Sequence, residues 1–433
     1  MIRRLLLLGA LALGVGVAVR LSTAPAPAVA TGRGGAYALS GGSSAQAEPT
    51  PTGLGARPYW QLLWTRPTPG LVAMNIAPGG QQVAWVDRTG SVRLMDETGR
   101  TRWQTRRGLA APGVNRLMAA PGGAVLAYSH LNPAAPSLHV FHGPKSVQRH
   151  SLDGAIWNAA VSTVGDRALV GTGRRSLYLF SLANTDAKKA ATQWRAPGIP
   201  DSLALLTNRS PLALSGTWQE TGVAAYSLDG TPRWRHDAPD EPSRSYAVAL
   251  SGDGRTAVAV SCEGPREGDA RIQVWEADSG ALVFSVDLAD AFHPRALLSY
   301  DGRTIALSYL KIRKYRTGDV TEHKLALYDR AGNPLFREKG GLFFSPRKLV
   351  ALSGDGQRLT VLDGANTLFT LDARGRFVPG AQTRLPADAR TGAVPAIRDT
   401  IPTPDGRYLL LRQAGDRISL LKATGDAAAV PAP

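Results

Sequence analysis

Seven histidines are the side chains that could most readily serve as metal ligands or general bases. His139 and His142 stand three residues apart in a stretch, Leu-His-Val-Phe-His, that is typical of a β-strand. Successive side chains of a strand point to opposite faces, so this pair is not expected to converge on one metal ion. The chain has neither an H-E-x-x-H nor a G-x-S-x-G motif. We therefore predict no metal site and no nucleophilic triad.

Four aspartates recur in one setting, each beside a glycine and ahead of an apolar run. In such a turn an Asp side chain accepts hydrogen bonds from backbone N–H groups, and glycine adopts a positive φ at no steric cost. Turn residues are therefore expected here rather than catalytic carboxylates. No cluster of Asp, Asn and Glu marks a calcium site, and no cofactor is predicted. The four residues are Asp253, Asp301, Asp355 and Asp405.

The stretch from Ala247 to Asp287 is the clearest copy of the unit that must position any site. Short apolar runs cover residues 247–250, 257–261, 272–275 and 282–286, and Gly, Asp, Pro or Ser bound each of them. That pattern predicts four strands joined by tight turns. A four-stranded antiparallel unit of about 45 residues, repeated in tandem, is typical of a β-propeller blade.

The first turn of this unit recurs along the whole chain, which predicts an all-β, eight-bladed propeller with four antiparallel strands in each blade. Seven blades are the alternative, because the third and fourth turns lack Asp-Gly. The eighth unit shows only three strands, whereas residues 59–65, Tyr-Trp-Gln-Leu-Leu-Trp-Thr, belong to no unit. We expect this N-terminal strand to complete the last blade and close the ring. The eight turns end at Gly80, Gly123, Asp166, Ser210, Gly254, Gly302, Gly356 and Gly406.

A second signal lies in the turn between the third and fourth strands, where an aromatic residue follows Asp and Gly. We expect this aromatic to lie on the outer strand and to pack on the next blade. Blade two has no equivalent near Val147. The aromatics are Trp103, Trp194, Trp234, Phe284, Phe336 and Phe377.

These two motifs, S-x-D-G before a strand and D-x-x-G-x-x-x-W/F after one, resemble the repeats of WD-repeat-like and quinoprotein-like β-propellers of bacterial envelopes. The likeness covers most of residues 58–423 and implies the propeller fold. Among exported eight-bladed members, the chain looks most similar in function to a lipoprotein subunit of the outer-membrane assembly machinery that binds its partner through propeller loops. This chain has no lipobox cysteine. Quinoprotein dehydrogenases bind pyrroloquinoline quinone with calcium, often beside a vicinal disulfide, which the single cysteine, Cys262, excludes.

Residues 1–30 are predicted to be a signal peptide, because Arg3 and Arg4 precede an apolar run from Leu5 to Val19 and small residues follow. As a helix the run would rise about 22 Å, short of a hydrocarbon layer of about 30 Å, which favours cleavage over retention as an anchor. We predict a flexible Gly/Ser/Pro linker at 31–57, a single propeller at 58–423 and a flexible tail at 424–433. The expected location is periplasmic or extracellular, with membrane anchoring as the alternative.

The formal net charge of +16 bears on the choice of partner. A basic exported protein is drawn to phospholipid head groups, acidic glycans and wall polymers. We therefore expect an envelope protein or an anionic polymer or glycan as partner, leave peripheral membrane association open, and expect a monomer. Nucleic acid fits the sign of the charge. It is not expected as the partner, because the protein is predicted to be exported and has no aromatic-plus-basic stacking motif. An Arg-rich solvated surface is the alternative explanation.

The loops between second and third strands are long at residues 131–137, 263–270 and 311–321, with a moderate one at 216–221. Such loops share a face with the blade-to-blade connections, so those of blades four to six are expected to form one binding surface. The blade-six loop is cationic and partly aromatic, which suits an acidic partner, although a solvated hairpin explains it as well. The candidate partner-binding residues are Trp218, Arg266, His293, Arg295, Lys311, Arg313, Lys314, Tyr315 and Arg316.

The sequence thus favours a non-enzymatic scaffold that binds a protein or polymer through its loops. The alternative is a propeller enzyme, quinoprotein dehydrogenase-like or lactonase-like, with a site in the central channel. Converging polar side chains on the first strands would favour the enzyme. The first strands at residues 72–75 and 247–250, and in part at 296–298, are small and apolar, so binding is favoured.

Overall fold

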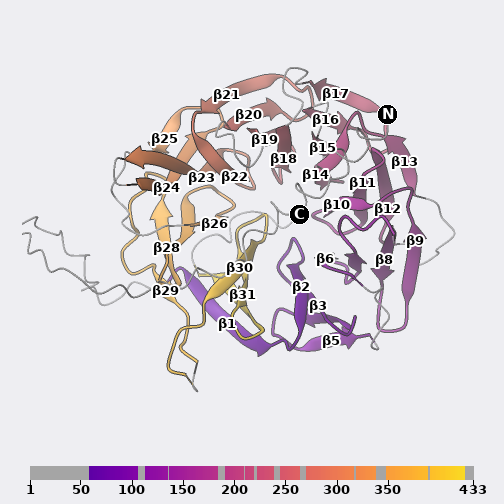
Figure 1. Ribbon diagram of the computed structural model, residues 1–433, viewed down its shortest axis with the longest axis horizontal. Helices are drawn as coiled ribbons and strands as arrows, with labels where there is room; N and C mark the ends of the chain where they lie inside the picture. The colour runs from indigo at the N-terminus through magenta and orange to yellow at the C-terminus, as the bar shows by residue number, and fades with distance from the viewer. Residues whose placement is uncertain are drawn as a thin grey trace, which may run out of the picture. The chain divides into compact units, whose positions relative to one another are not determined.

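The computed structural model describes residues 58–105, 113–134, 136–183, 191–208, 210–218, 222–237, 244–263, 270–315, 318–337, 348–388 and 391–424. Within these ranges every regular element is a β-strand, and the strands form eight blades of four around a ring (Figure 1). The eight-bladed prediction is confirmed, and the seven-bladed alternative is wrong. The predicted signal peptide, the linker and residues 425–433 of the tail lie outside the described residues. The described part contains no helix that could cross a bilayer.

Each of the first four blades runs from an innermost to an outermost strand in chain order. Blade one is β2 (Leu71–Ile76), β3 (Gln82–Asp87), β4 (Val92–Asp96) and β5 (Thr101–Gln104), and blade two is β6 (Arg116–Ala119), β7 (Val125–Tyr128), β8 (Ser137–Phe141) and β9 (Val147–Ser151). Blade three is β10 (Ile156–Val161), β11 (Arg167–Thr172), β12 (Ser176–Ser181) and β13 (Thr192–Arg195), and blade four is β14 (Ile199–Leu206), β15 (Leu212–Trp218), β16 (Val223–Tyr226) and β17 (Pro232–His236).

The next three blades follow the same order, and the eighth takes its outermost strand from the N-terminal side. Blade five is β18 (Arg244–Leu250), β19 (Thr256–Glu263), β20 (Ala270–Glu276) and β21 (Leu282–Leu288), and blade six is β22 (Ala291–Leu298), β23 (Thr304–Tyr315), β24 (Gly318–Asp329) and β25 (Pro334–Arg337). Blade seven is β26 (Lys348–Leu352), β27 (Arg358–Leu362), β28 (Thr367–Asp372) and β29 (Thr383–Arg384), and blade eight is β30 (Ile397–Pro402), β31 (Tyr408–Gln413), β32 (Arg417–Ala423) and β1 (Trp60–Pro67).

The ring is closed by β1, which pairs antiparallel with β32 from Trp60↔Ala423 to Pro67↔Arg417. At the middle of this pair the hydroxyl oxygens of Thr65 and Ser419 lie 2.8 Å apart. Backbone groups of β32 that would otherwise form an open edge are thereby paired. The predicted closure by the N-terminal strand is confirmed.

The Asp-Gly turns between first and second strands share one hydrogen-bond pattern. In blade five the Ser251 hydroxyl donates to Asp253 Oδ1 at 2.6 Å, and the same oxygen accepts the Arg255 N–H at 3.0 Å. Gly254 has φ of +74°, which a residue with a Cβ adopts only with strain. The Ser/Thr-to-Asp bond recurs at residues 299–301, 353–355 and 403–405. The recurrent aspartates are turn acceptors, as predicted.

Neighbouring blades interlock where an outer-strand aromatic covers a turn glycine of the next blade. Trp234 covers Gly280, on which a Cβ would lie 2.5 Å from the indole ring, and its Nε1 donates to the Ala277 carbonyl at 2.7 Å. The predicted packing of the outer aromatic on the next blade is thereby confirmed for these residues. The same contact pairs Trp64 with Gly99, Trp194 with Gly230, Phe284 with Gly332 and Phe336 with Gly375.

Three blades depart from this scheme. In blade one, Trp103 packs against the core shared with blade two, but a Cβ on Gly143, the turn glycine of blade two, would meet no atom within 4 Å. Phe377, expected on the outer strand of blade seven, instead bridges to Leu371, packs its ring on Phe369 of its own blade and is 41% exposed. That expectation is wrong because the outer strand, β29, begins only at Thr383. In blade two the aromatic position is taken by His150, whose ring lies 4.7 Å from that of Phe180 in blade three.

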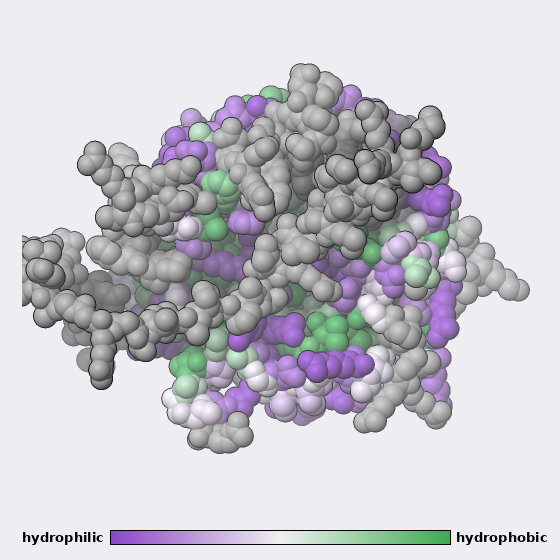
Figure 2. Space-filling model, viewed as in Figure 1, coloured by the Kyte–Doolittle hydropathy of each residue, from purple (hydrophilic) through white to green (hydrophobic). Residues whose placement is uncertain are grey.

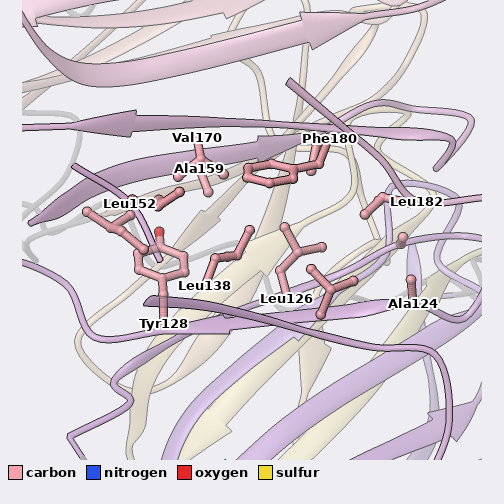
Figure 3. Packing of buried hydrophobic residues seen from close by; sticks show 13 residues of the cluster. Ala124, Leu126, Tyr128, Leu138, Leu152, Ala159, Val170, Phe180 and Leu182 are labelled. Atoms are coloured by element: carbon pink, nitrogen blue, oxygen red, sulfur yellow. The ribbon is translucent and has the colours of Figure 1, made fainter. Parts of the chain in front are cut away.

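The hydrophobic core is divided among the interfaces between blades. Between blades two and three, Leu126, Tyr128 and Leu138 pack with Val170 and Phe180 (Figure 3). A blade buries both of its faces in this way, so its inner strands are apolar at nearly every position, as in β7, where all four residues are buried. Side chains available for binding are therefore expected in the turns and at the ends of the innermost strands.

Candidate functional site

We call the loop face the face of the ring on which second strands end and first strands begin. On this face the sheets of blades four and five meet, because Trp218 at the end of β15 pairs with Ser245 in β18. The two blades therefore form one continuous sheet. The loop-face ends of blades four and five are thus held together by backbone pairing.

Blade six extends from the loop face as a β-hairpin. The pairing of β23 with β24 runs from Thr304↔Asp329 to Tyr315↔Gly318, whereas β22 follows β23 only as far as Ala291↔Lys311. Within the described residues, the two strands beyond Lys311 pair only with each other. The expectation of a loop at 311–321 is therefore wrong, and the extended hairpin that the sequence left open as the alternative is found instead. Aromatic and β-branched residues at positions 309, 312, 315, 320 and 321 favour the extended strands found there.

The hairpin carries both signs of charge. At its base, Lys311 Nζ lies 3.7 Å from Asp290 Oδ2. Lys311 also stands opposite Glu322 in register, and Glu322 Oε2 lies 2.7 Å from Lys324 Nζ on the same strand. Opposite charges across a strand pair favour the pairing, so part of the positive charge supports the hairpin itself. Arg266, Arg316 and the side chains of Arg313, Lys314 and Tyr315 lie outside what the structure describes.

Trp218 contributes an aromatic pair to the loop face. Its ring stacks on Trp157, at the start of β10 in blade three, with ring centroids 5.2 Å apart and an interplanar angle of 22°. Both tryptophans are partly exposed. Gly173 makes room for this pair, since a Cβ on it would lie 2.7 Å from Trp157 Nε1. Sequence reasoning singled out Trp218 and missed Trp157, which sits in the first strand of another blade.

His293 and Arg295 lie in β22 and face different surroundings. His293 is exposed and has φ of +49°, and the pairing with β23 shifts register between Phe292 and Arg295. The Arg295 side chain crosses to blade seven, where Nη1 donates to the Leu349 carbonyl at 3.4 Å. Burial lowers the pKa of Arg295, and the Asp399 carboxylate partly opposes that shift.

Arg295 belongs to a charged group at the centre of the ring, which also contains Lys348 of β26 and Asp399 of β30. Burial lowers the pKa of Lys348, Arg295 lowers it further, and Asp399 raises it. Lys348 is nevertheless solvent-exposed. Protein surrounds this side chain at the ring centre, but water still reaches it. Below the grey atoms in Figure 2, hydrophilic and hydrophobic residues lie side by side on the face in view. Blade six thus places Arg295 directly before residues 296–298, for which a small, apolar lining was expected, and blades seven and eight add Lys348 and Asp399.

Other first strands use a polar residue to bond the next blade. Asn75 Oδ1 accepts the Ala119 N–H at 3.1 Å, and Asn158 Nδ2 donates to the Asp201 carbonyl at 2.6 Å. In both strands the Asn is the single polar residue of a short apolar run, whereas β22 and β30 each contain more than one polar residue.

The histidines of blade two are structural in their contacts. His139 is 2% exposed and stacks on Phe141, whereas His142 lies in the turn after β8 and bonds Ser146 through its backbone N–H. The pair does not share a strand, so the predicted opposite-face relation does not arise. Among the described residues, no group of three or more His, Cys, Asp or Glu side chains could hold a metal ion.

Comparison with solved structures places the fold among WD40-type and BamB-like β-propellers. The propeller of Dos1 matches with a TM-score of 0.56 at 12% identity, covering 84% of this chain and 95% of that one. The C-terminal WD40 domain of Sif2 matches with a TM-score of 0.57 at 12% identity over 86% of this chain and all of that one. BamB from Moraxella catarrhalis matches with a TM-score of 0.53 at 14% identity over 84% and 99%.

The sequence itself matches no family model and no curated protein. Identities of 12–14% show a shared architecture and carry no function from those proteins to this chain. The candidate site therefore depends on the hairpin, the tryptophan pair and the central charges described above.

Proposed function

We propose that this chain is an exported, non-enzymatic propeller that binds a protein or an anionic polymer of the cell envelope through its loop face. The observation that carries the proposal is the β23–β24 hairpin, which continues past the end of β22. An extended hairpin beyond the blade offers contact surface that closing the ring does not require.

Two further features support a binding role for the same face. The Trp157–Trp218 stack presents partly exposed aromatic area, and aromatic side chains are enriched at protein interfaces. The chain carries a formal net charge of +16, which favours an acidic partner and speeds encounter with it. A signal peptide at residues 1–30, as the sequence predicts, would deliver the chain to envelope partners.

Neutralising the cations of the hairpin tests this proposal. The variant is expected to keep the cooperative unfolding of the propeller, because these cations support only the hairpin, and to lose retention on envelope fractions of the producing organism. Unchanged retention would overturn the hairpin as the binding surface, and retention on phospholipid vesicles alone would replace the protein or polymer partner with a membrane surface. The substitutions are Lys311→Gln, Arg313→Gln, Lys314→Gln and Arg316→Gln.

A matched control removes four exposed cations from the turns of the opposite face. Net charge falls by the same amount, so a general electrostatic effect would lower retention equally in both variants. Retention of the control at the wild-type level would locate binding on the loop face. The control substitutions are Arg100→Gln, Arg255→Gln, Arg303→Gln and Arg374→Gln.

The central charges favour a second candidate function, a propeller enzyme with its site at the ring centre. Arg295, Lys348 and Asp399 are converging polar groups of the kind that this alternative requires. Purified protein with bound quinone or metal, or with lactone hydrolysis abolished by Asp399→Asn, would place this candidate first. Protein without either property supports the binding scaffold.

A further inference from the structure

We propose that the loop-face ends of the innermost strands of blades six to eight form an anion-binding site, in which Arg295 and Lys348 hold a carboxylate or phosphate group. This site is separate from the hairpin and does not depend on the proposed function. It draws on three side chains that come from three successive innermost strands, β22, β26 and β30.

Backbone geometry brings the two cations together. The Arg295 guanidinium reaches from β22 to β26 and donates to the carbonyl of Leu349, the residue that follows Lys348. Lys348 opens β26 and pairs with Leu362 at the end of β27, which places it at the loop face. Arg295 and Lys348 therefore lie beside one another at one edge of the ring centre, close enough for their charges to interact.

The positive charge of this pair is only partly balanced within the described structure. Asp399 stabilises the charged forms of both cations, but no ion pair within 4.0 Å joins it to either of them among the described residues. Its Oδ1 accepts the Thr400 N–H at 2.8 Å. The arginine nearest in register, Arg412, donates to the Val72 and Leu71 carbonyls of blade one at 3.4 and 3.0 Å.

Two neighbouring cations that repel one another are stabilised when an anion lies between them. Arginine presents a planar fork of N–H donors that matches a carboxylate or phosphate, and lysine adds a mobile point charge. Asp399 can accept a hydrogen bond, so a ligand with a hydroxyl or ammonium group beside its anionic group fits all three side chains. The same anionic chemistry is offered by a free small molecule and by an acidic side chain of a peptide.

Calorimetric titration tests the site on the full chain, with inorganic phosphate and citrate as small anions and hexaglutamate as an acidic peptide. Lys348→Gln and Arg295→Gln are each expected to weaken binding about tenfold, the size of a lost charge-assisted hydrogen bond. Asp399→Asn is expected to strengthen the binding of phosphate, since it removes the one negative charge. Binding of the small anions identifies a free ligand, and binding of hexaglutamate alone identifies an acidic segment.

Arg398→Gln is the matched control, because it removes an exposed cation next to Asp399 and is expected to change affinity less than about twofold. A side-chain NMR titration supplies a readout that folding defects do not mimic. The pKa of Lys348 lies below its ordinary value of 10.5 in the free protein and should rise when an anion binds. Equal binding by the wild-type chain and Lys348→Gln, or no binding of any probe, would overturn the site.

Discussion

The Trp60 indole N–H donates a 2.9 Å hydrogen bond to Oγ1 of Thr360, a residue 300 positions further along the chain. Trp60 begins the strand that completes blade eight, and Thr360 lies in the second strand of blade seven. The bond therefore ties the closing strand to the neighbouring blade as well as to its own. Closure depends on this buried indole in addition to the backbone pairing with β32.

Trp60→Ala is expected to destabilise the propeller by about 3–5 kcal/mol, because Trp60 is only 1% exposed and its removal leaves a large cavity. Thr360→Val removes the hydrogen bond alone and is expected to cost about 1–3 kcal/mol. Denaturant midpoints of both variants check the ranking. If Trp60→Ala were no more harmful than Thr360→Val, closure by β1 would not depend on the packing of this indole.

A disulfide across the closing strands should stabilise the ring. Thr65 and Ser419 face one another in register with their hydroxyl oxygens 2.8 Å apart, which suits a pair of cysteines. In a Cys262→Ser background, oxidised Thr65→Cys/Ser419→Cys protein is expected to gain about 2–4 kcal/mol over its reduced form. The single variant Thr65→Cys controls for the substitution. Failure of the pair to oxidise would contradict the observed register.

Alanine substitutions at Gly280 and Gly415 distinguish the cost of backbone strain from the cost of a steric clash with a neighbouring aromatic ring. Both have positive φ, +71° and +77°, but a Cβ would clash with Trp234 only at Gly280. Gly415→Ala is expected to cost about 1–2 kcal/mol from backbone strain. Gly280→Ala adds about 1–3 kcal/mol of overpacking against the tryptophan. Equal destabilisation of the two variants would show that the aromatic interlock contributes little to blade packing.

Acid destabilisation should depend in part on His130. Burial, helped by the Arg116 charge, lowers the pKa of His130 from 6.5 to about 4. Between these two pH values the unfolded chain binds a proton that the folded chain resists, so stability falls as pH is lowered through that window. His130→Asn should flatten part of the decline in urea midpoints between pH 6.5 and 4. His293→Asn, at an exposed position, controls for the loss of an imidazole, and the same decline in all three proteins would contradict the assignment.

The fold could be predicted from the sequence because its signals are local and repeated. The turn around Asp253 and Gly254 recurs along the chain, and each copy contains the groups that form its own hydrogen bonds. The closing strand could also be predicted, since the sequence of blade eight shows only three strands and residues 59–65 belong to no other blade. The prediction for Phe377 was wrong because the Asp-Gly-aromatic motif is present there, but the outer strand begins only at Thr383.

The candidate site was harder to predict because its members come from different blades. Trp157 and Trp218 are 61 positions apart in the numbering and come into contact only because their blades are neighbours in the propeller. Lys348 and Asp399 each look like a solvated charge at the start of a strand. Their relation to Arg295 depends on bulges in the innermost strands, which shift the register at Leu349/Ala351 and at Ile397/Asp399.

Site-specific photo-crosslinking in living cells tests the central claim, that a partner binds the loop face, most directly. A crosslinking amino acid at Thr321, exposed on the hairpin, is compared with one at Ala331, exposed in the turn between β24 and β25 of the same blade. The account predicts a discrete adduct from Thr321 and none from Ala331. Adducts from Ala331 alone, or none from either position, would contradict a loop-face partner.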